Sequence, residues 1–159
     1  MVFLFISIIL FNVIAFKKNK IPTMNRKVNI WTFTIALQVV FDVVIEFKFK
    51  GYWYFDKGVD WMGVLAHTIL IPPFNIMLLS LFPFNSSFVK KAIFISLCTV
   101  GIIIYEALVL IPEPWGFFHL GWWKLWYDTF CAPMLILILT GYYRWICKLE
   151  EKLLDNHKN

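Results

Sequence analysis

Among the polar side chains inside the apolar segments of this sequence, six have chemistry that could carry a function. They are Asp42, Glu46, His67, Asn75, Glu106 and Asp128. An ionisable group at the centre of a bilayer costs about 2.5–3.5 kcal/mol on insertion scales, so each one needs a structural or functional reason. Carboxylates and imidazole are acid–base groups and cation ligands. We predict that the six residues form a polar cavity that faces the outer side of the membrane.

The spacing of these residues predicts that they meet at one depth. Asp42 and Glu46 are four residues apart and therefore lie on one face of a helix. Asp42 and Glu106 each lie about 7 Å inside the outer end of a helix, at about 1.5 Å per residue. His67 and Asp128 enter from the same side and reach a depth of roughly 5–9 Å. Such groups either pair with one another and fix helix packing, or bind a ligand, ion or proton.

The sequence offers no motif for catalysis or for a cofactor. Two carboxylates and one imidazole could hold a divalent ion. However, neither a Glu-x-x-His pair nor a His-Glu-x-x-His motif is present. A serine nucleophile elbow and an intramembrane-protease motif are also missing. We therefore predict no catalytic residue, no metal and no other cofactor.

The elements that must position these residues are apolar segments long enough to cross a bilayer. The chain has 159 residues, of which 60% are hydrophobic and 16% charged, against about 45–50% and about 25% in soluble domains. Crossing the hydrocarbon takes about 20 apolar residues. Five segments approach that length: residues 1–16, 29–47, 61–82, 92–111 and 125–147. We predict an all-α, polytopic membrane protein with a single five-helix transmembrane domain over residues 1–147.

The basic residues predict the orientation of this bundle. Eleven of the 15 Lys and Arg residues fall in the loops and tail on one side, and four fall on the other. The basic side of a membrane protein faces the cytoplasm. We therefore expect the N-terminus outside, the C-terminus inside, and residues 148–159 as a cytoplasmic tail. The net charge of +5 does not indicate nucleic-acid binding, because the basic residues lie at the ends of apolar runs.

Aromatic residues gather in two segments, 47–61 and 121–128, at the predicted outer ends of the spans. Tyrosine and tryptophan favour the headgroup layer, where the ring is apolar and the polar atom is hydrated. We predict that Trp53, Tyr54, Trp61, Trp122, Trp123 and Trp126 anchor the protein at this interface. The alternative is that these rings line a site for a lipid headgroup or a sugar.

Prolines predict irregular backbone in two places. Pro72 and Pro73 interrupt the third span near mid-membrane, and they remove two backbone donors there. The result is either a simple kink or a broken helix of the kind that forms transporter sites. Residues 112–123 contain two prolines and two glycines. We expect that segment to be non-helical and to lie in the outer interface.

Several short motifs occur together along the chain. They are Asp42, Lys48, YWYFDKGVDW at 52–61, PFN at 73–75, LFPF at 81–84, YE at 105–106 and WKLWYD at 123–128. As a set over about residues 10–145, they resemble a family of small, uncharacterised multi-span membrane proteins of endospore-forming Gram-positive bacteria. The resemblance implies a multi-pass protein of a bacterial plasma membrane. It implies no activity, ligand or catalytic residue.

These observations leave three classes of function. The first is a non-enzymatic binding, sensing or accessory subunit, which small size and the missing catalytic motifs favour. The second is a membrane-embedded enzyme that uses the outer carboxylates and His67 on lipid or peptide. The third is a subunit of a small transporter or channel, which would need a membrane-protein partner or further copies of the chain. In all three the lipid bilayer is the surrounding solvent.

Overall fold

The computed structural model describes residues 1–58 and 61–156, and most of that chain is helical. The helical elements are α1 (Val2–Lys18), α2 (Met24–Asp42), η1 (Val43–Lys48), α3 (Trp61–Leu65), η2 (Ala66–Leu70), α4 (Ile71–Leu81), α5 (Phe88–Val109), η3 (Leu125–Tyr127) and α6 (Asp128–Asn156). Because α2 runs into η1, and α3 into η2 and α4, they form five helical rods in all among the described residues. The five predicted apolar helices are confirmed, although the second begins five residues before its expected bound and the last ends nine residues beyond it.

Four of the rods are long and apolar enough to cross a membrane. They cover Met24–Lys48, Trp61–Leu81, Phe88–Val109 and Leu125–Leu153, and α1 is a shorter apolar helix of 17 residues. Only 11% to 39% of the most apolar part of each long rod is buried inside the protein. Large apolar side chains such as Leu97, Phe130 and Leu137 are more than half exposed. A surface this apolar is typical of proteins whose helices cross a membrane.

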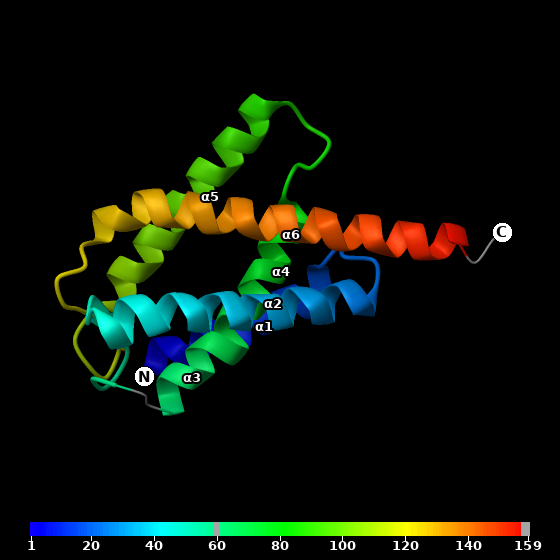
Figure 1. The fold of residues 1–159 in the computed structure, drawn as a ribbon. Coiled ribbons are helices and arrows are strands. Elements are labelled where there is room, and N and C mark those ends of the chain that lie inside the picture. Colours follow the sequence, from blue (N-terminus) through cyan, green and yellow to red (C-terminus); the bar gives the residue numbers. More distant parts are fainter. Residues whose placement is uncertain (59–60, 157–159) are drawn as a thin grey trace.

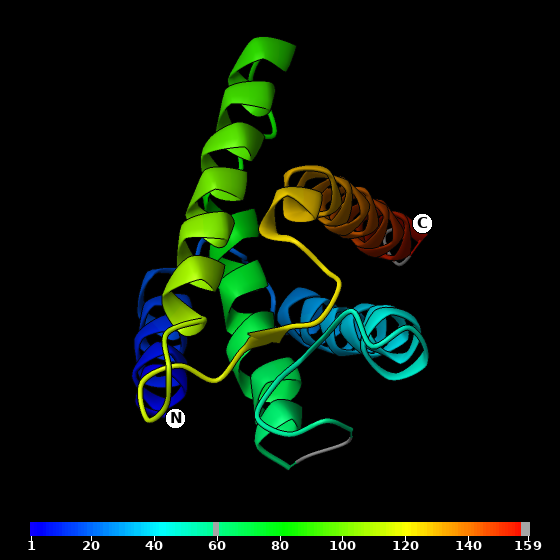
Figure 2. The same cartoon turned by 90° about the vertical axis from the view of Figure 1, so that its left-hand side faces the viewer.

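Successive rods run in alternating directions, and the described chain begins and ends at opposite ends of the molecule (Figure 1). The α2 and α6 helices lie side by side and antiparallel, and α1 packs against α4. The α5 helix crosses α6 obliquely, and its N-terminal half extends away from the other helices (Figure 2). The last helix continues through the predicted tail as far as Asn156, and residues 157–159 of that tail lie outside the described part of the chain.

Two rods contain a π-helical turn. In the second rod it is η1, which follows α2 directly, and in the third it is η2, which precedes Pro72 and Pro73 at the start of α4. A proline near the first turn of a helix is tolerated because its missing amide would have no helical partner there. The predicted irregularity of the third span is therefore present, and it takes the form of a widened turn before the prolines.

The two aromatic segments meet and cover one end of the bundle. Strand β1 (Tyr52–Trp53) pairs with β2 (His119–Leu120) in an antiparallel ladder, which is a departure from a purely helical fold. Gly121 donates its backbone N–H to the carbonyl of Gly51 at 2.8 Å. A Cβ at Gly121 would lie 2.5 Å from the Lys50 carbonyl oxygen, so only glycine allows this approach. We call the paired segments 49–58 and 112–124 the strap.

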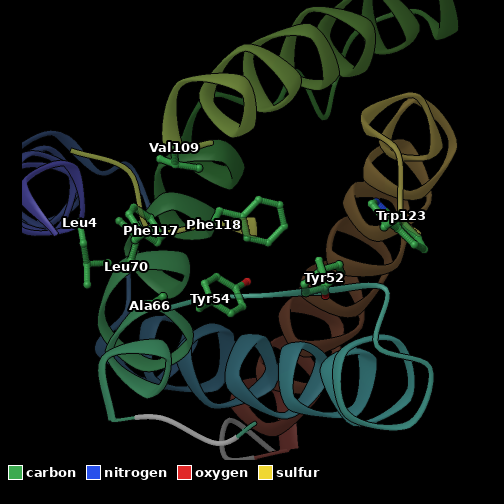
Figure 3. Close-up of a cluster of buried hydrophobic side chains, with 9 residues drawn as sticks. All are labelled: Leu4, Tyr52, Tyr54, Ala66, Leu70, Val109, Phe117, Phe118 and Trp123. Atoms are coloured by element: carbon green, nitrogen blue, oxygen red, sulfur yellow. The ribbon is translucent and has the colours of Figure 1, made fainter. Parts of the chain in front are cut away.

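The strap contributes side chains to a buried cluster between the helices (Figure 3). Phe117 and Phe118, which were expected in the outer interface, are 2% and 9% exposed. Two predicted interface anchors, Tyr54 and Trp123, also lie inside this cluster, while Trp61, Trp122 and Trp126 are at least half exposed and Trp53 is half-buried. Trp123 can be buried because Asp128 accepts a hydrogen bond from its indole Nε1 at 3.0 Å.

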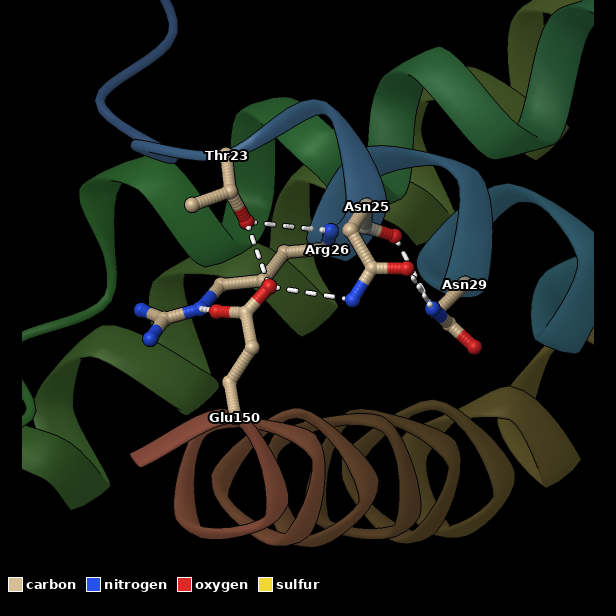
Figure 4. Close-up of polar contacts among 5 residues, drawn as sticks. All are labelled: Thr23, Asn25, Arg26, Asn29 and Glu150. Carbon is tan, nitrogen blue, oxygen red and sulfur yellow. Dashed lines mark hydrogen bonds and ion pairs between the residues drawn. The ribbon is translucent and has the colours of Figure 1, made fainter. Parts of the chain in front are cut away.

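A polar network closes the opposite end of the bundle (Figure 4). Thr23 caps α2 by accepting the backbone N–H of Arg26 at 3.2 Å, as N-cap threonines commonly do. Glu150 of α6 accepts hydrogen bonds from Thr23 Oγ1 at 2.9 Å and from Asn25 Nδ2 at 3.0 Å, and it pairs with Arg26. The start of the second rod is therefore tied to the end of the last one.

Candidate functional site

The structure brings three of the predicted site residues together at one buried point beneath the strap. Asp42 ends α2, Glu46 lies in η1 and His67 lies in η2. Their exposed fractions are 2%, 5% and 9%. The distance from His67 Nδ1 to Asp42 Oδ2 is 3.0 Å. One ligating atom from each residue lies within 4.8 Å of those of the other two, so the three could share a metal ion.

Two further side chains hold the carboxylate of Asp42. The hydroxyl of Tyr52 donates a hydrogen bond to Oδ1. Gln38, one helical turn before Asp42, donates from Nε2 to Oδ2 at 3.2 Å. Burial raises the pKa of Tyr52, and the nearby Tyr54 and Asp42 raise it further, so Tyr52 remains a protonated donor at neutral pH. The carboxylate therefore has a fixed orientation.

The ring of Tyr54 packs against the imidazole of His67. The two rings are nearly perpendicular, with their centroids 4.7 Å apart. Burial raises the pKa of the Tyr54 phenol, and the negative charges of Asp42, Glu46 and Glu106 raise it further. Tyr54 therefore stays uncharged at neutral pH.

Glu106 and Asp128 form the second acidic group, where α5 approaches the start of α6. Their carboxyl groups interact with each other, and Asp128 is also held by Trp123. Oxygen Oε2 of Glu106 is buried, and the carboxyl group of Asp128 hydrogen-bonds that of Glu106. A buried acceptor of this kind costs free energy unless a donor reaches it.

A cavity of about 560 Å³ runs from this acidic pair into the bundle. Its walls come from α1, α2, α4, α5, α6 and the strap, and they are mostly aliphatic and aromatic. The polar residues on its wall are Thr34, Gln38, Tyr52, Tyr54, Asn75, Tyr105, Glu106 and Asp128. The volume lies within the range of about 300–1,000 Å³ that is usual for small-molecule sites.

The six predicted residues are thus divided among three places. Asp42, Glu46 and His67 form the trio, and Glu106 and Asp128 form the pair at the cavity wall. Asn75 lies deeper along the cavity, where its Nδ2 donates to Thr34 Oγ1 at 3.1 Å. The expectation of a single polar cavity therefore needs correction, because the trio packs behind Tyr52 and Tyr54 and is not part of the cavity wall.

Sequence reasoning overlooked two contributors to this region. Tyr52 was expected only among the interfacial aromatics, and its bond to Asp42 spans a turn that no sequence pattern predicts. Asn12 of α1 was not considered, although a lone amide in an apolar helix is a signal of an interhelical contact. It donates to the carbonyl of Ile69 at 3.0 Å.

Comparisons with known proteins identified no relative of this chain. No protein-family model, no curated protein and no solved structure matches this chain.

Proposed function

We propose that the protein is a five-span protein of a bacterial plasma membrane, with its N-terminus outside and its C-terminus in the cytoplasm. The alternating rods support this arrangement, because they place the strap and its few lysines at one end and most basic residues at the other. In this orientation α1 is a short fifth span, which local thinning of the bilayer accommodates. The strap and the trio then lie on the extracellular side.

The orientation is tested by labelling single cysteines. With Cys98, Cys131 and Cys147 replaced by serine, cysteines at Lys57 and at Lys20 lie on opposite sides of the membrane. A membrane-impermeant maleimide should label the position 57 cysteine in intact cells and the position 20 cysteine only after permeabilisation. The reverse result would mean that the protein is inserted the other way round.

The function we propose is binding of a small amphipathic cation, by a membrane protein that is itself not an enzyme. The carrying observation is the Glu106–Asp128 pair, two interacting carboxyl groups on the wall of a largely apolar cavity. An ammonium group would donate hydrogen bonds to this pair and would be attracted by its negative charge. The aromatic faces of Tyr54, Phe118 and Trp123 add cation–π attraction. The aliphatic walls suit an alkyl chain.

Binding of dodecylamine tests this proposal directly. Protein in lipid nanodiscs should bind dodecylamine saturably, with empty nanodiscs as the background. It should bind the amine at least about tenfold more tightly than dodecanol, because a charge-assisted hydrogen bond contributes about 1.5–3 kcal/mol. Dodecanoate should not bind. Glu106→Gln should remove the preference for the amine, while Glu113→Gln, an exposed acid outside the cavity wall, should keep it. Equal binding of amine and alcohol would refute the proposal.

Two other readouts separate the alternative functions. Formation of a new product from lipid extracts would support a membrane-embedded enzyme, and ion flux in proteoliposomes would support a transporter or channel subunit. Co-purification of a stable membrane-protein partner with neither activity would support an accessory subunit that responds to the bound amphiphile.

A further inference from the structure

The trio of Asp42, Glu46 and His67 is separate from the cavity, and its side chains are of the types that bind metal ions. Two carboxylates and one imidazole converge from two neighbouring rods, and all three residues are more than nine-tenths buried. Surface acids often gather without an ion. Burial of two carboxylates beside one imidazole is different, because these are metal-ligand groups held within ligand distance of one another and away from water.

The distances within the trio are close to those of a coordination sphere. Two ligands of a tetrahedral ion lie about 3.4 Å apart when each bond is about 2.1 Å, and adjacent ligands of an octahedral ion lie about 3.0 Å apart. The contact between His67 Nδ1 and Asp42 Oδ2 is 3.0 Å, and the widest separation within the trio is at most 4.8 Å.

The backbone at the trio has a second, independent feature. Glu46 lies in η1 and His67 lies in η2, which are the two π-helical turns of the described chain. Turn η2 lies inside a helical rod, where π-helical turns are rare and occur frequently at functional sites, whereas η1 ends its rod. Here both turns occur at the same level of adjacent rods, and each carries one of the converging side chains.

The groups around Asp42 also match the surroundings of a metal ligand. Ligating carboxylates are usually held by hydrogen bonds from neighbouring residues, which orient them toward the ion. Tyr52 donates to Oδ1, and Gln38 donates to the same carboxylate. Oxygen Oδ2, which faces His67, would bind the ion.

We propose that Asp42, Glu46 and His67 bind one divalent first-row transition-metal ion on the strap side of the bundle. One nitrogen and two oxygen ligands suit Zn²⁺ or Mn²⁺, whereas Ca²⁺ favours six to eight oxygens. The ion would join the second rod to the third. This site does not depend on the cavity or on its ligand.

The first test measures metal in the full-length protein. Protein purified in detergent, treated with a chelator and then dialysed against Zn²⁺ or Mn²⁺, should retain one ion per chain by elemental analysis and should unfold at a higher temperature than the chelated form. Ca²⁺ should neither bind at this ratio nor raise the unfolding temperature. Co²⁺, used as a spectroscopic substitute, should give visible absorption bands of a protein-bound ion. Failure of the unaltered protein to retain any of the transition metals overturns the proposal.

The second test assigns the ligands. Glu46→Gln and His67→Gln should each weaken Zn²⁺ binding by more than about 100-fold, since even residues that only orient a ligand contribute 10–100-fold. The matched controls are Glu106→Gln, a buried carboxyl outside the trio, together with His119→Gln and His157→Gln. These three variants should bind Zn²⁺ like the unaltered chain. Loss of binding in a histidine control, or retention of it in both trio variants, would place the ion elsewhere and refute this site.

Asp42→Asn is the third ligand variant, and it should also weaken Zn²⁺ binding. If Asp42→Asn elutes as aggregate, Glu46→Gln and His67→Gln alone decide which residues bind the ion. If neither of those folds, the metal content, Co²⁺ spectrum and thermal shift of the unaltered protein still decide whether an ion is bound. A failure of dodecylamine binding would not affect any of these measurements.

Discussion

Asn12 of α1 donates a hydrogen bond to the carbonyl oxygen of Ile69, four residues before Pro73. In an uninterrupted α-helix the amide of residue 73 would donate to that oxygen, but proline has no amide hydrogen. The Asn12 side chain also donates to the carbonyl of Ile8 at 2.8 Å. A polar residue of the shortest rod therefore supplies a donor at the interruption of the third rod.

We predict that Asn12→Leu lowers the free energy of unfolding by about 1 kcal/mol, because it removes the donor to the Ile69 carbonyl inside the membrane. The measurement is reversible unfolding of the protein in mixed detergent micelles. The same substitution in a Pro73→Ala background, where an amide is again present at residue 73, should cost less than half as much. An equal cost in both backgrounds would show that Asn12 acts by another contact.

Removing the hydroxyl of Tyr52 should loosen the carboxylate of Asp42 without removing a metal ligand. Tyr52→Phe keeps the ring within the buried cluster and deletes only the donor to Oδ1. We expect Zn²⁺ to bind about 10–100-fold more weakly, as for other residues that orient a ligand, with one ion per chain still bound at saturation. Competition with a chromophoric chelator measures the change.

Tyr127→Phe is the control for this variant, because Tyr127 lies near the same end of the bundle and its ring packs against Trp122, Trp123 and Trp126. It should bind Zn²⁺ like the unaltered protein. A Tyr52→Phe protein with unchanged affinity would mean that the phenol only packs.

Filling the cavity from α5 should block the ligand and leave the fold intact. Gly101 lies on the cavity wall, and a Cβ built there would meet no heavy atom within 4 Å outside its own helix backbone. Gly101→Leu should reduce dodecylamine binding at least about tenfold, and it should not lower stability, because leucine favours a helix over glycine.

The matched control is Gly141→Leu. Gly141 also has open space around its Cβ position, but it lies outside the cavity wall. Dodecylamine binding to this variant, measured in the same nanodiscs, should equal that of the unaltered chain. Inhibition by both leucines would indicate that the amine binds at the outer helix surface.

The network around Glu150 should stabilise the opposite end of the bundle by a modest amount. Glu150→Ala removes the acceptor for Thr23 and Asn25 and the partner of Arg26. Since the ion pair is near the surface, we expect the free energy of unfolding to fall by about 1 kcal/mol. High salt screens the ion pair and should therefore cause part of the same loss in the unaltered protein. Thermal unfolding at low and high ionic strength measures both effects.

Glu151→Ala is the neighbouring control for that measurement. Glu151 is exposed, whereas Glu150 is half-buried at the network. The control should have the same unfolding temperature as the unaltered chain at both salt concentrations. A larger loss for Glu151→Ala than for Glu150→Ala would contradict the role of the network.

The positions of the rods could be predicted from the sequence, because the length of an apolar run is set by the thickness of the hydrocarbon. The rise per residue predicts that Asp42, Glu46 and His67 lie at similar depths in the membrane. For this reason residues of two different rods were expected to meet. The rotation of each rod could not be predicted in the same way. Lipid and protein interior are both apolar, so no amphipathic pattern indicates which face is buried.

The strap shows a second limit. A tryptophan or tyrosine at the end of a span suits the headgroup layer and a buried cluster equally well, because it is apolar with one polar atom. Trp122 is half exposed and Trp123 is buried, although they are adjacent and identical in type. Two contacts cause this difference. The pairing of β1 with β2 joins residues that are far apart in the sequence, and the hydrogen bond from Trp123 to Asp128 spans a turn.

The pairing of β1 with β2 also limits how molecules reach the interior. Tyr52, Phe118 and Trp123 of the strap form part of the cavity wall, and backbone hydrogen bonds join the two halves of the strap across that end. A hydrophobic guest that partitions into the bilayer would then enter sideways, from the acyl chains between neighbouring helices. Its uptake would follow its concentration in the lipid rather than its concentration in the surrounding water.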